Sequence, residues 1–174
     1  HRVVEASHAE LRILPVSIVY DFMTSGRTRC SIRIGPEFAC ERSWSRRELD
    51  ARVRRALLHQ MTLNVGHVMA AVLREWPAGV ARSLDGVEVA AHTHVRRLAA
   101  MGVPLDGRLS MRWTFRRRLR QFLAYARKNG VLQFDGRDWR VAQGLAHPKM
   151  RYVRNELEDV EQSRAEVIPP LSPI

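Results

Sequence analysis

The seven histidines are the side chains best suited to acid–base chemistry in this chain. A histidine that acts as a base is normally oriented by an acidic partner. His67 lies in an apolar segment with no Asp, Glu or Cys at helical spacing, which favours a structural role over a catalytic one. His92 and His94 are two residues apart and would face different sides of a helix, a poor geometry for a metal ion. The sequence predicts no metal site.

Arginine supplies nearly all of the positive charge. The 29 basic residues exceed the 18 acidic ones, which gives a net charge of +11 and a pI near 11.2. Only Lys128 and Lys149 are lysines. Arginine makes bidentate contacts with phosphate, so the composition indicates a partner such as nucleic acid, an anionic membrane, coenzyme A or an acyl carrier protein. A genome that favours arginine codons would give the same composition, because the arginines are spread over the whole chain.

Three of these arginines form a regular stripe. Arg112, Arg116 and Arg120 are one turn apart on a helix that the apolar periodicity predicts over 111–128. The stripe is a candidate surface for an anionic membrane or for DNA, although a solvated face has the same pattern. The predicted apolar face of this helix consists of Phe115, Leu119, Phe122, Leu123 and Ala126.

Composition limits the class of protein. With 174 residues, 45% hydrophobic and 27% charged, the chain can bury a core. Charged residues interrupt every apolar run well before the ~20 residues that a membrane span needs, so no transmembrane helix is expected. The first residues lack both a Met and an apolar signal region, which predicts no signal peptide and a truncated chain. Cys30 and Cys40 are expected to be reduced thiols of a cytoplasmic protein.

The elements that would position these residues begin with two strands. Residues 13–19 are an almost continuous apolar run, which predicts a strand covered on both faces of an α/β sheet. Residues 30–34 alternate between apolar and polar, as in a half-solvated strand. The turn chemistry of residues 24–26 makes the two strands neighbours. Pro15 cannot donate a ladder hydrogen bond, so it is expected at a strand start or a bend.

These residues carry a resemblance to a known family. The segment LRILPV at 11–16, followed by Gly35-Pro36-Glu37, resembles the fourth conserved block and the following strand of the glycerolipid acyltransferases. The rest resembles the C-terminal part of the glycerol-3-phosphate acyltransferase branch, from the MTLNVGHVMAAVL segment to the closing RYVRNELE. The resemblance implies transfer of a fatty acyl group from acyl-CoA or acyl carrier protein to glycerol 3-phosphate in phospholipid synthesis. No cofactor is implied. The residues that it places at the substrate pocket are Ile13, Leu14, Pro15 and Val16.

Two departures from the family pattern affect this interpretation. The family strand usually closes as Gly-Glu-Pro, whereas this chain has Gly-Pro-Glu at 35–37. The catalytic signature of the family is a His and an Asp separated by four residues, and none of the seven histidines is followed by such an Asp. A catalytic half is therefore expected upstream of His1, or missing, and the chain alone is expected to be inactive. Residues 2–10 are predicted to be the tail of a helix leading into the first strand.

The expected fold is an incomplete α/β arrangement. Residues 1–44 would hold the strand pair from the C-terminal part of an acyltransferase sheet, and 45–162 a mostly helical region with a winged-helix-like hairpin at 131–141. Residues 163–174 are expected to be a loose tail. Local signals support the helices, including a Ser45–Glu48 capping box and Pro148 in a first helical turn.

The alternative function is DNA binding. A helix, a loop, an Arg-rich helix and a hairpin follow one another over 83–141, which is the order of a winged-helix module. This interpretation leaves residues 1–75 without a role, so the acyltransferase interpretation is favoured. The predicted location is the cytoplasm, peripheral at the inner face of the membrane. The predicted partners are the anionic membrane surface, the acyl donor and an N-terminal catalytic half.

Overall fold

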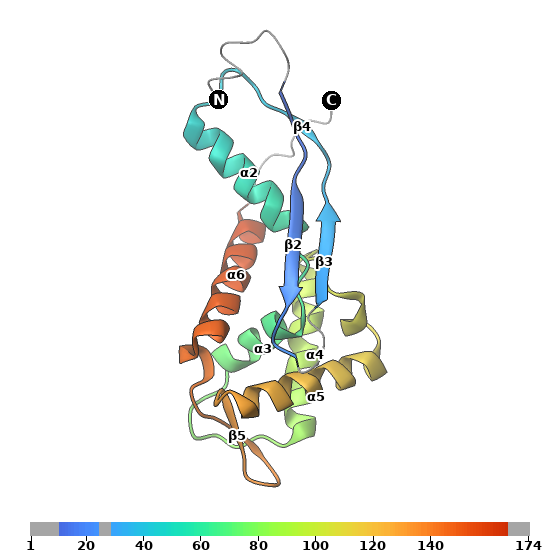
Figure 1. Ribbon diagram of the computed structural model, residues 1–174, viewed down its shortest axis with the longest axis vertical. Helices are drawn as coiled ribbons and strands as arrows, with labels where there is room; N and C mark the ends of the chain where they lie inside the picture. Colours follow the sequence, from blue (N-terminus) through green and yellow to red (C-terminus); the bar gives the residue numbers. More distant parts are fainter. Residues whose placement is uncertain (1–10, 25–28, 167–174) are drawn as a thin grey trace.

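The protein has a mixed α/β architecture. The computed structural model describes residues 11–24 and 29–166, and within them there are five α-helices and three small antiparallel two-stranded sheets. The molecule is elongated: α3 to α6 gather towards one end, and a long β-ribbon runs from them to the other end beside α2 (Figure 1). The predicted combination of a strand pair, a mostly helical region and a hairpin is confirmed. The predicted helix tail at 2–10 lies outside the described residues.

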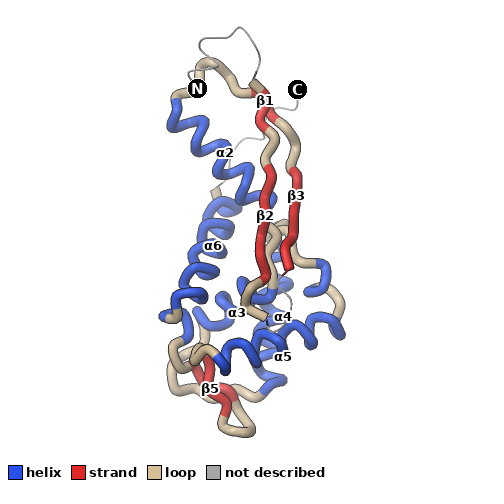
Figure 2. The backbone as a smooth tube through the Cα atoms, viewed as in Figure 1, coloured by secondary structure: helices blue, strands red, loops and turns tan. Residues whose placement is uncertain are grey.

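The β-ribbon is a long hairpin with one interruption. Strand β1 (Arg12–Ile13) pairs with β4 (Phe38–Ala39), and β2 (Val16–Asp21) pairs with β3 (Arg29–Ile34), as Figure 2 shows. Between the two ladders, residues 14–15 lie opposite the longer segment 35–37, so the register shifts as at a β-bulge. The N–H of Gly35 donates a 2.9 Å hydrogen bond to the carbonyl of Pro15. Pro15 therefore lies directly before the start of β2, which confirms one of the two positions expected for it.

One face of the ribbon is apolar and exposed. The prediction that residues 13–19 are covered on both faces is wrong for the described structure, because side chains of β2 alternate between exposed and buried. Ile18 is 51% exposed, and Ile32 and Ile34 across from β2 are 60% and 65% exposed. Neither a helix nor a further strand of the described residues covers this side. The apolar face of the ribbon consists of Val16, Ile18, Tyr20, Cys30, Ile32 and Ile34.

The helices begin and end at local sequence signals. In α2, the Ser45 side chain accepts from the Glu48 N–H and the Glu48 side chain accepts from the Ser45 N–H, so the predicted capping box is confirmed. Helix α4 stops before Gly102, which has a φ of 69°. Pro148 occupies the first turn of α6 as predicted. The helices are α2 (Arg46–Gln60), α3 (Val65–Arg74), α4 (Leu84–Ala100), α5 (Arg112–Lys128) and α6 (Pro148–Ala165).

Most of the core lies among α3, α4, α5 and α6. Helix α3 is buried over nearly its whole length, and the predicted apolar face of α5 is entirely buried. A smaller cluster joins Phe38 and Trp44 to α2. Helix α6 continues to Ala165 and buries Ser163, so the predicted loose tail is wrong for its first residues. The remainder, 167–174, lies outside the described residues.

The hairpin of β5 (Leu132–Phe134) and β6 (Trp139–Val141) has a third backbone partner. Arg82 and Trp139 exchange two backbone hydrogen bonds of 2.9 and 2.8 Å, just before α4 begins. The order along the chain is thus α3, a bridging residue, α4, α5 and a hairpin. This is the order of a winged helix, with the isolated Arg82–Trp139 bridge at the place of the short strand that precedes the second helix.

A buried ion pair joins the ribbon to the helices. The carboxylate of Asp21, at the end of β2, accepts from the guanidinium of Arg118 in the middle of α5. Both residues are at most 7% exposed. Desolvation by burial raises the pKa of Asp21, and the Arg118 charge acts in the opposite direction.

Replacement of Arg118 by methionine should lower the free energy of unfolding by about 3 kcal/mol, because Asp21 is left buried without its cation. The double variant with Asp21→Asn should lose less, since no charge is then unpaired. Urea unfolding measures both variants.

The stability of the Arg118→Met variant as a function of pH provides a second test of the Asp21–Arg118 ion pair. A carboxyl pKa that is raised in the folded state favours folding at low pH, and this contribution is lost as the pH rises through the folded pKa. The loss of unfolding free energy relative to the wild type should be small below about pH 4, near the ordinary Asp pKa, where Asp21 is protonated. The loss should be complete above the raised pKa of Asp21 in the folded variant. A loss that is independent of pH would contradict the assignment to a buried, unpaired Asp21.

Candidate functional site

The outer side of α5 is the most distinctive charged surface of the described structure. Its basic face consists of Arg117, Arg120, Arg127 and Lys128, together with Arg112, which lies at the start of the helix on the side towards α4. All five are exposed, and within the described residues none lies within 4 Å of a carboxylate. The apolar side of α5 faces the core, and this orientation turns these charges outward. Met111 and Trp113, at the start of α5, are 63% and 72% exposed.

Arg116 does not belong to this face. Its guanidinium is 3.2 Å from a carboxylate oxygen of Asp85 and 3.0 Å from one of Glu88, both on α4. The side chain of Glu88 is only 9% exposed, so the contact ties α5 to α4. The predicted stripe is thus divided: Arg112 and Arg120 are free of acidic partners among the described residues, and Arg116 is a link between helices.

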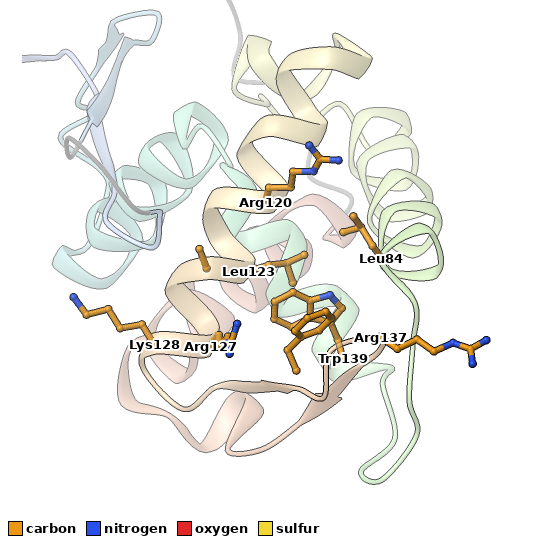
Figure 3. A pocket seen from close by; sticks show the side chains of 9 residues that line it. Leu84, Arg120, Leu123, Arg127, Lys128, Arg137 and Trp139 are labelled. Carbon is orange, nitrogen blue, oxygen red and sulfur yellow. The ribbon is translucent and has the colours of Figure 1, made fainter.

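A cleft lies next to the basic face. It is formed by α5, the start of α4 and the β5–β6 hairpin, and has a volume of about 650 Å³. Leu123 and Trp139 lie at its centre, while the charged ends of Arg120, Lys128 and Arg137 extend outward at its edges (Figure 3). The described residues that line it include no Asp or Glu. They are Leu84, Arg120, Leu123, Ala124, Arg127, Lys128, Phe134, Arg137 and Trp139.

Two aromatic rings form one wall of the cleft. The ring centroids of Phe134 and Trp139 are 4.7 Å apart and the rings are tilted by 35°. The guanidinium of Arg127 lies 5.8 Å from the Phe134 centroid, within the range of a cation–π contact. The backbone of Trp139 is held by Arg82 as described above, which fixes this wall against α4.

The hairpin turn leaves one of its arginines unpaired. Asp135 accepts backbone N–H bonds from Asp138 and Arg137, and these bonds lower the pKa of its carboxyl. Its other oxygen lies 2.5 Å from the guanidinium of Arg140. The side chain of Arg137 has no ionic partner among the described residues and lines the cleft.

The predicted substrate residues are spread over the bend in the ribbon. Ile13 packs against the cluster that contains Phe38 and Trp44, and Pro15 is buried. Leu14 is 55% exposed, and Val16 belongs to the apolar face of the ribbon. They lie towards the end of the molecule opposite to α5 (Figure 1), so the structure does not bring them to the basic face. Their role in substrate binding stays a prediction.

His67 has an acidic neighbour that the sequence did not indicate. Its Nε2 is 3.2 Å from a carboxylate oxygen of Glu156, which lies 89 positions further along the chain on α6. Its Nδ1 accepts the Asn64 backbone N–H at 3.2 Å and closes the cap of α3. Glu156 also raises the pKa of Tyr152 through a hydrogen bond. With 1% exposure, His67 has the position of a structural side chain.

His92 and His94 face different sides of α4, as their spacing of two residues predicts. His94 is buried and its Nε2 lies 3.3 Å from a carboxylate oxygen of Glu75; burial lowers its pKa. His92 instead packs against Phe115, with ring centroids 4.1 Å apart. Among the described residues, no group of three or more His, Cys, Asp and Glu side chains could hold a metal ion.

Comparisons of the chain with protein-family models, with curated proteins and with solved structures found no match. The resemblance to the acyltransferases therefore stays a prediction. Among the described residues, no helix has the length and apolar character needed to span a bilayer.

The different environments of two adjacent arginines can be tested. Arg116→Gln should lower the free energy of unfolding by about 1 kcal/mol, because Glu88 loses its cation. Arg117→Gln should change it by less than about 0.5 kcal/mol, since Arg117 is exposed and has no acidic partner among the described residues. Urea unfolding of the two variants gives the comparison, and equal effects would show that Arg116 is not a link between helices.

Proposed function

We propose that this chain is the C-terminal portion of an acyltransferase of the glycerol-3-phosphate type, which contacts an anionic membrane through α5. The apolar face of the ribbon is the observation that carries the proposal. The 174 residues contain no His and Asp separated by four residues, the pair that supplies the general base in this family. In this proposal the general base belongs to a catalytic part outside these residues.

The apolar face of the ribbon is the surface expected of strands that belong to a larger sheet. A two-stranded hairpin is marginal by itself and gains stability when its apolar face is covered. Three isoleucines, Ile18, Ile32 and Ile34, are more than half exposed on one side. Contiguous exposed apolar surface of this kind marks a site of interaction. The catalytic part of an acyltransferase sheet is the proposed cover, next to the LRILPV segment that carries the resemblance.

In the proposed reaction, the hydroxyl of glycerol 3-phosphate attacks the thioester carbonyl of acyl-CoA or of an acylated carrier protein. The proton of the hydroxyl passes to a histidine of the catalytic part, and the thiol of the carrier leaves. Residues 13–16 of this chain would shape the pocket. Pro15 lies in the interruption between β1 and β2 and sets the direction of β1 relative to β2. The Pro15–Gly35 hydrogen bond holds this bend.

The start of α5 has the composition of a membrane-surface contact. Exposed Met111 and Trp113 stand beside Arg112 and Arg117. Tryptophan is favoured at the membrane–water interface, and each basic side chain near an anionic surface contributes about 1 kcal/mol. This arrangement supports peripheral attachment at the cytoplasmic face.

A second candidate is DNA binding by a winged helix. It is favoured by the Arg82–Trp139 bridge, which lies where that fold has a short strand before its second helix. In this model α5 would enter the major groove, and the β5–β6 hairpin would contact the backbone. We rank it second because it assigns no role to the apolar face of the ribbon.

The isolated chain should have no acyltransferase activity. General-base assistance contributes roughly 10²–10⁴ in rate, and this chain has no residue pair of the type that provides it in the family. The activity is measured as the release of free thiol from acyl-CoA that depends on glycerol 3-phosphate, with a protein-free reaction as the control. Turnover above the control would contradict the assignment of the general base to a catalytic part outside this chain.

Replacement of three arginines should separate the two functions. Arg112, Arg117 and Arg120 changed to Gln should weaken binding to anionic vesicles by about 1 kcal/mol each, with little change in duplex binding at physiological salt. The matched control changes three exposed arginines on other elements, Arg33 of β3, Arg47 of α2 and Arg151 of α6, and removes the same charge.

Vesicle sedimentation and duplex titration are run on both triple variants. Loss of duplex binding by the α5 variant would favour the winged-helix function instead. The slope of the logarithm of the binding constant against the logarithm of the salt concentration should then become shallower by about one unit per phosphate contact removed. Equal weakening by the control variant would show that only net charge matters.

A further inference from the structure

We infer that the outer edge of β3 binds an extended segment of a partner protein in which apolar and acidic residues alternate, and that this segment pairs with β3 as a further antiparallel strand. The segment lies beside β3, whereas the cover proposed above lies over the apolar face of the ribbon, so the inference does not depend on acyl transfer. It rests on the direction of the backbone groups of β3, on its exposed apolar side chains and on its two arginines.

The ladder of the ribbon fixes which backbone groups of β3 point outward. In an antiparallel pair, residues that exchange hydrogen bonds alternate with residues whose N–H and C=O groups point away from the partner strand. The Gly35 N–H donates to the Pro15 carbonyl, so Ile34, the next residue of β3, is of the outward kind. The carbonyl of Tyr20 follows this alternation, because it accepts from the side chain of Asn64, outside the ribbon, at 3.2 Å. The outward residues of β3 are Cys30, Ile32 and Ile34.

These outward backbone groups are unpaired within the part of the chain that the structure describes. Strand β3 pairs with β2 alone, and the groups of Cys30, Ile32 and Ile34 make no backbone hydrogen bond to another described segment. Helices α2 and α6 lie on the side of β2, so β3 forms the outer edge of the ribbon (Figure 1). An edge strand of six residues without proline or lysine is open to pairing with a further strand.

The side chains of β3 define the chemistry of the partner. On one face, Ile32 and Ile34 are 60% and 65% exposed. On the other face, Arg29 and Arg33 are exposed, and neither lies within 4 Å of a carboxylate among the described residues. Residues directly opposite each other on neighbouring strands share a face and interact. The strand that fits this edge therefore places apolar residues opposite the isoleucines and acidic residues opposite the arginines.

A second copy of this chain fits the same edge poorly. Two paired β3 strands would bring their arginines, two from each strand, to one face with no acidic residue of either strand among them. Like charges opposite each other on neighbouring strands are destabilising. The net charge of +11 on each chain adds to this repulsion. The charge thus favours an acidic strand of another protein.

Binding can be measured by isothermal titration calorimetry of the whole chain with a capped peptide of about seven residues that alternates valine with glutamate. We expect saturable binding of one peptide. A peptide with lysine in place of glutamate should bind about tenfold more weakly or less, since each opposite-charge pair becomes a like-charge pair. Equal affinity of the two peptides, or no saturable binding of the glutamate peptide, would overturn the proposal.

Methylation of single peptide nitrogens tests the pairing itself. In the antiparallel register, a valine opposite Ile32 directs its N–H towards β3, and the neighbouring glutamate directs its N–H away. Methylation of the central valine nitrogen should weaken binding by about tenfold, because a hydrogen bond is lost and the methyl group meets β3. Methylation of the neighbouring glutamate nitrogen is the matched control and should change the affinity by less than about threefold. Equal weakening by both would overturn edge pairing.

A charge reversal on β3 locates the site. Arg29→Glu with Arg33→Glu should reverse the preference, so that the lysine peptide binds more tightly than the glutamate peptide. This gain of binding cannot result from a folding defect. Arg47→Glu with Arg151→Glu makes the same change of net charge on α2 and α6 and should keep the preference of the wild type. An unreversed preference in the β3 variant would overturn the proposal.

Hydrogen exchange of the wild-type chain gives a measurement that needs no variant. In the free chain, the outward amides of Cys30, Ile32 and Ile34 should exchange faster than those of Ser31 and Arg33, which face β2. The glutamate peptide should slow exchange of the three outward amides. Slowing on α5 with none on β3 would overturn the proposal. Protection of the outward amides that rises with the concentration of the free chain would overturn it in favour of a second copy.

Discussion

The ion pair of Asp21 and Arg118 fixes how the two parts of the molecule meet. It joins the end of the β-ribbon to the middle of α5, where water is largely excluded. Thr24 donates to Asp21 and Arg118 donates to Gln121, so neither charged group is free to turn away. An unpaired charge at this depth costs several kcal/mol, which excludes arrangements in which the ribbon is shifted relative to α5. Because Arg118 and the apolar side chains of α5 are turned inward, the exposed Arg117, Arg120, Arg127 and Lys128 remain on the solvent side of the helix.

This arrangement explains why composition alone could not identify a functional surface. A net charge of +11 is compatible with a binding protein and with an arginine-rich genome. In the structure, part of the charge is neutralised between helices, as in the Arg74–Glu161 and Arg54–Asp159 pairs of α3 and α2 with α6. The outer side of α5 has no such partner within the described residues. Position relative to acidic side chains, and not the number of arginines, distinguishes this face.

The features that the sequence predicted well are local ones. The Ser45 cap and the start at Pro148 each depend on residues within one helical turn, and both are present. Contacts between distant segments could not be predicted: Glu156 reaches His67 across 89 positions, and Glu88 captures Arg116 from another helix. The apolar run of the first strand was misread for a related reason. Periodicity shows which side chains are apolar but cannot show what covers them.

The same long-range contacts bear on the choice between the two functions. The DNA-binding interpretation treats 83–141 as a module, but the winged-helix order itself begins with α3, and α5 packs in one core with α3 and with α6, which both lie outside these limits. Met69 and Leu157 are fully buried in that core, and Arg118 is paired with a residue of the ribbon. Removal of the flanking segments would expose this core and separate the ion pair. The winged arrangement is therefore built into a larger unit that includes the ribbon, and a function for this unit has to account for the exposed apolar face of the ribbon as well as for the cations of α5.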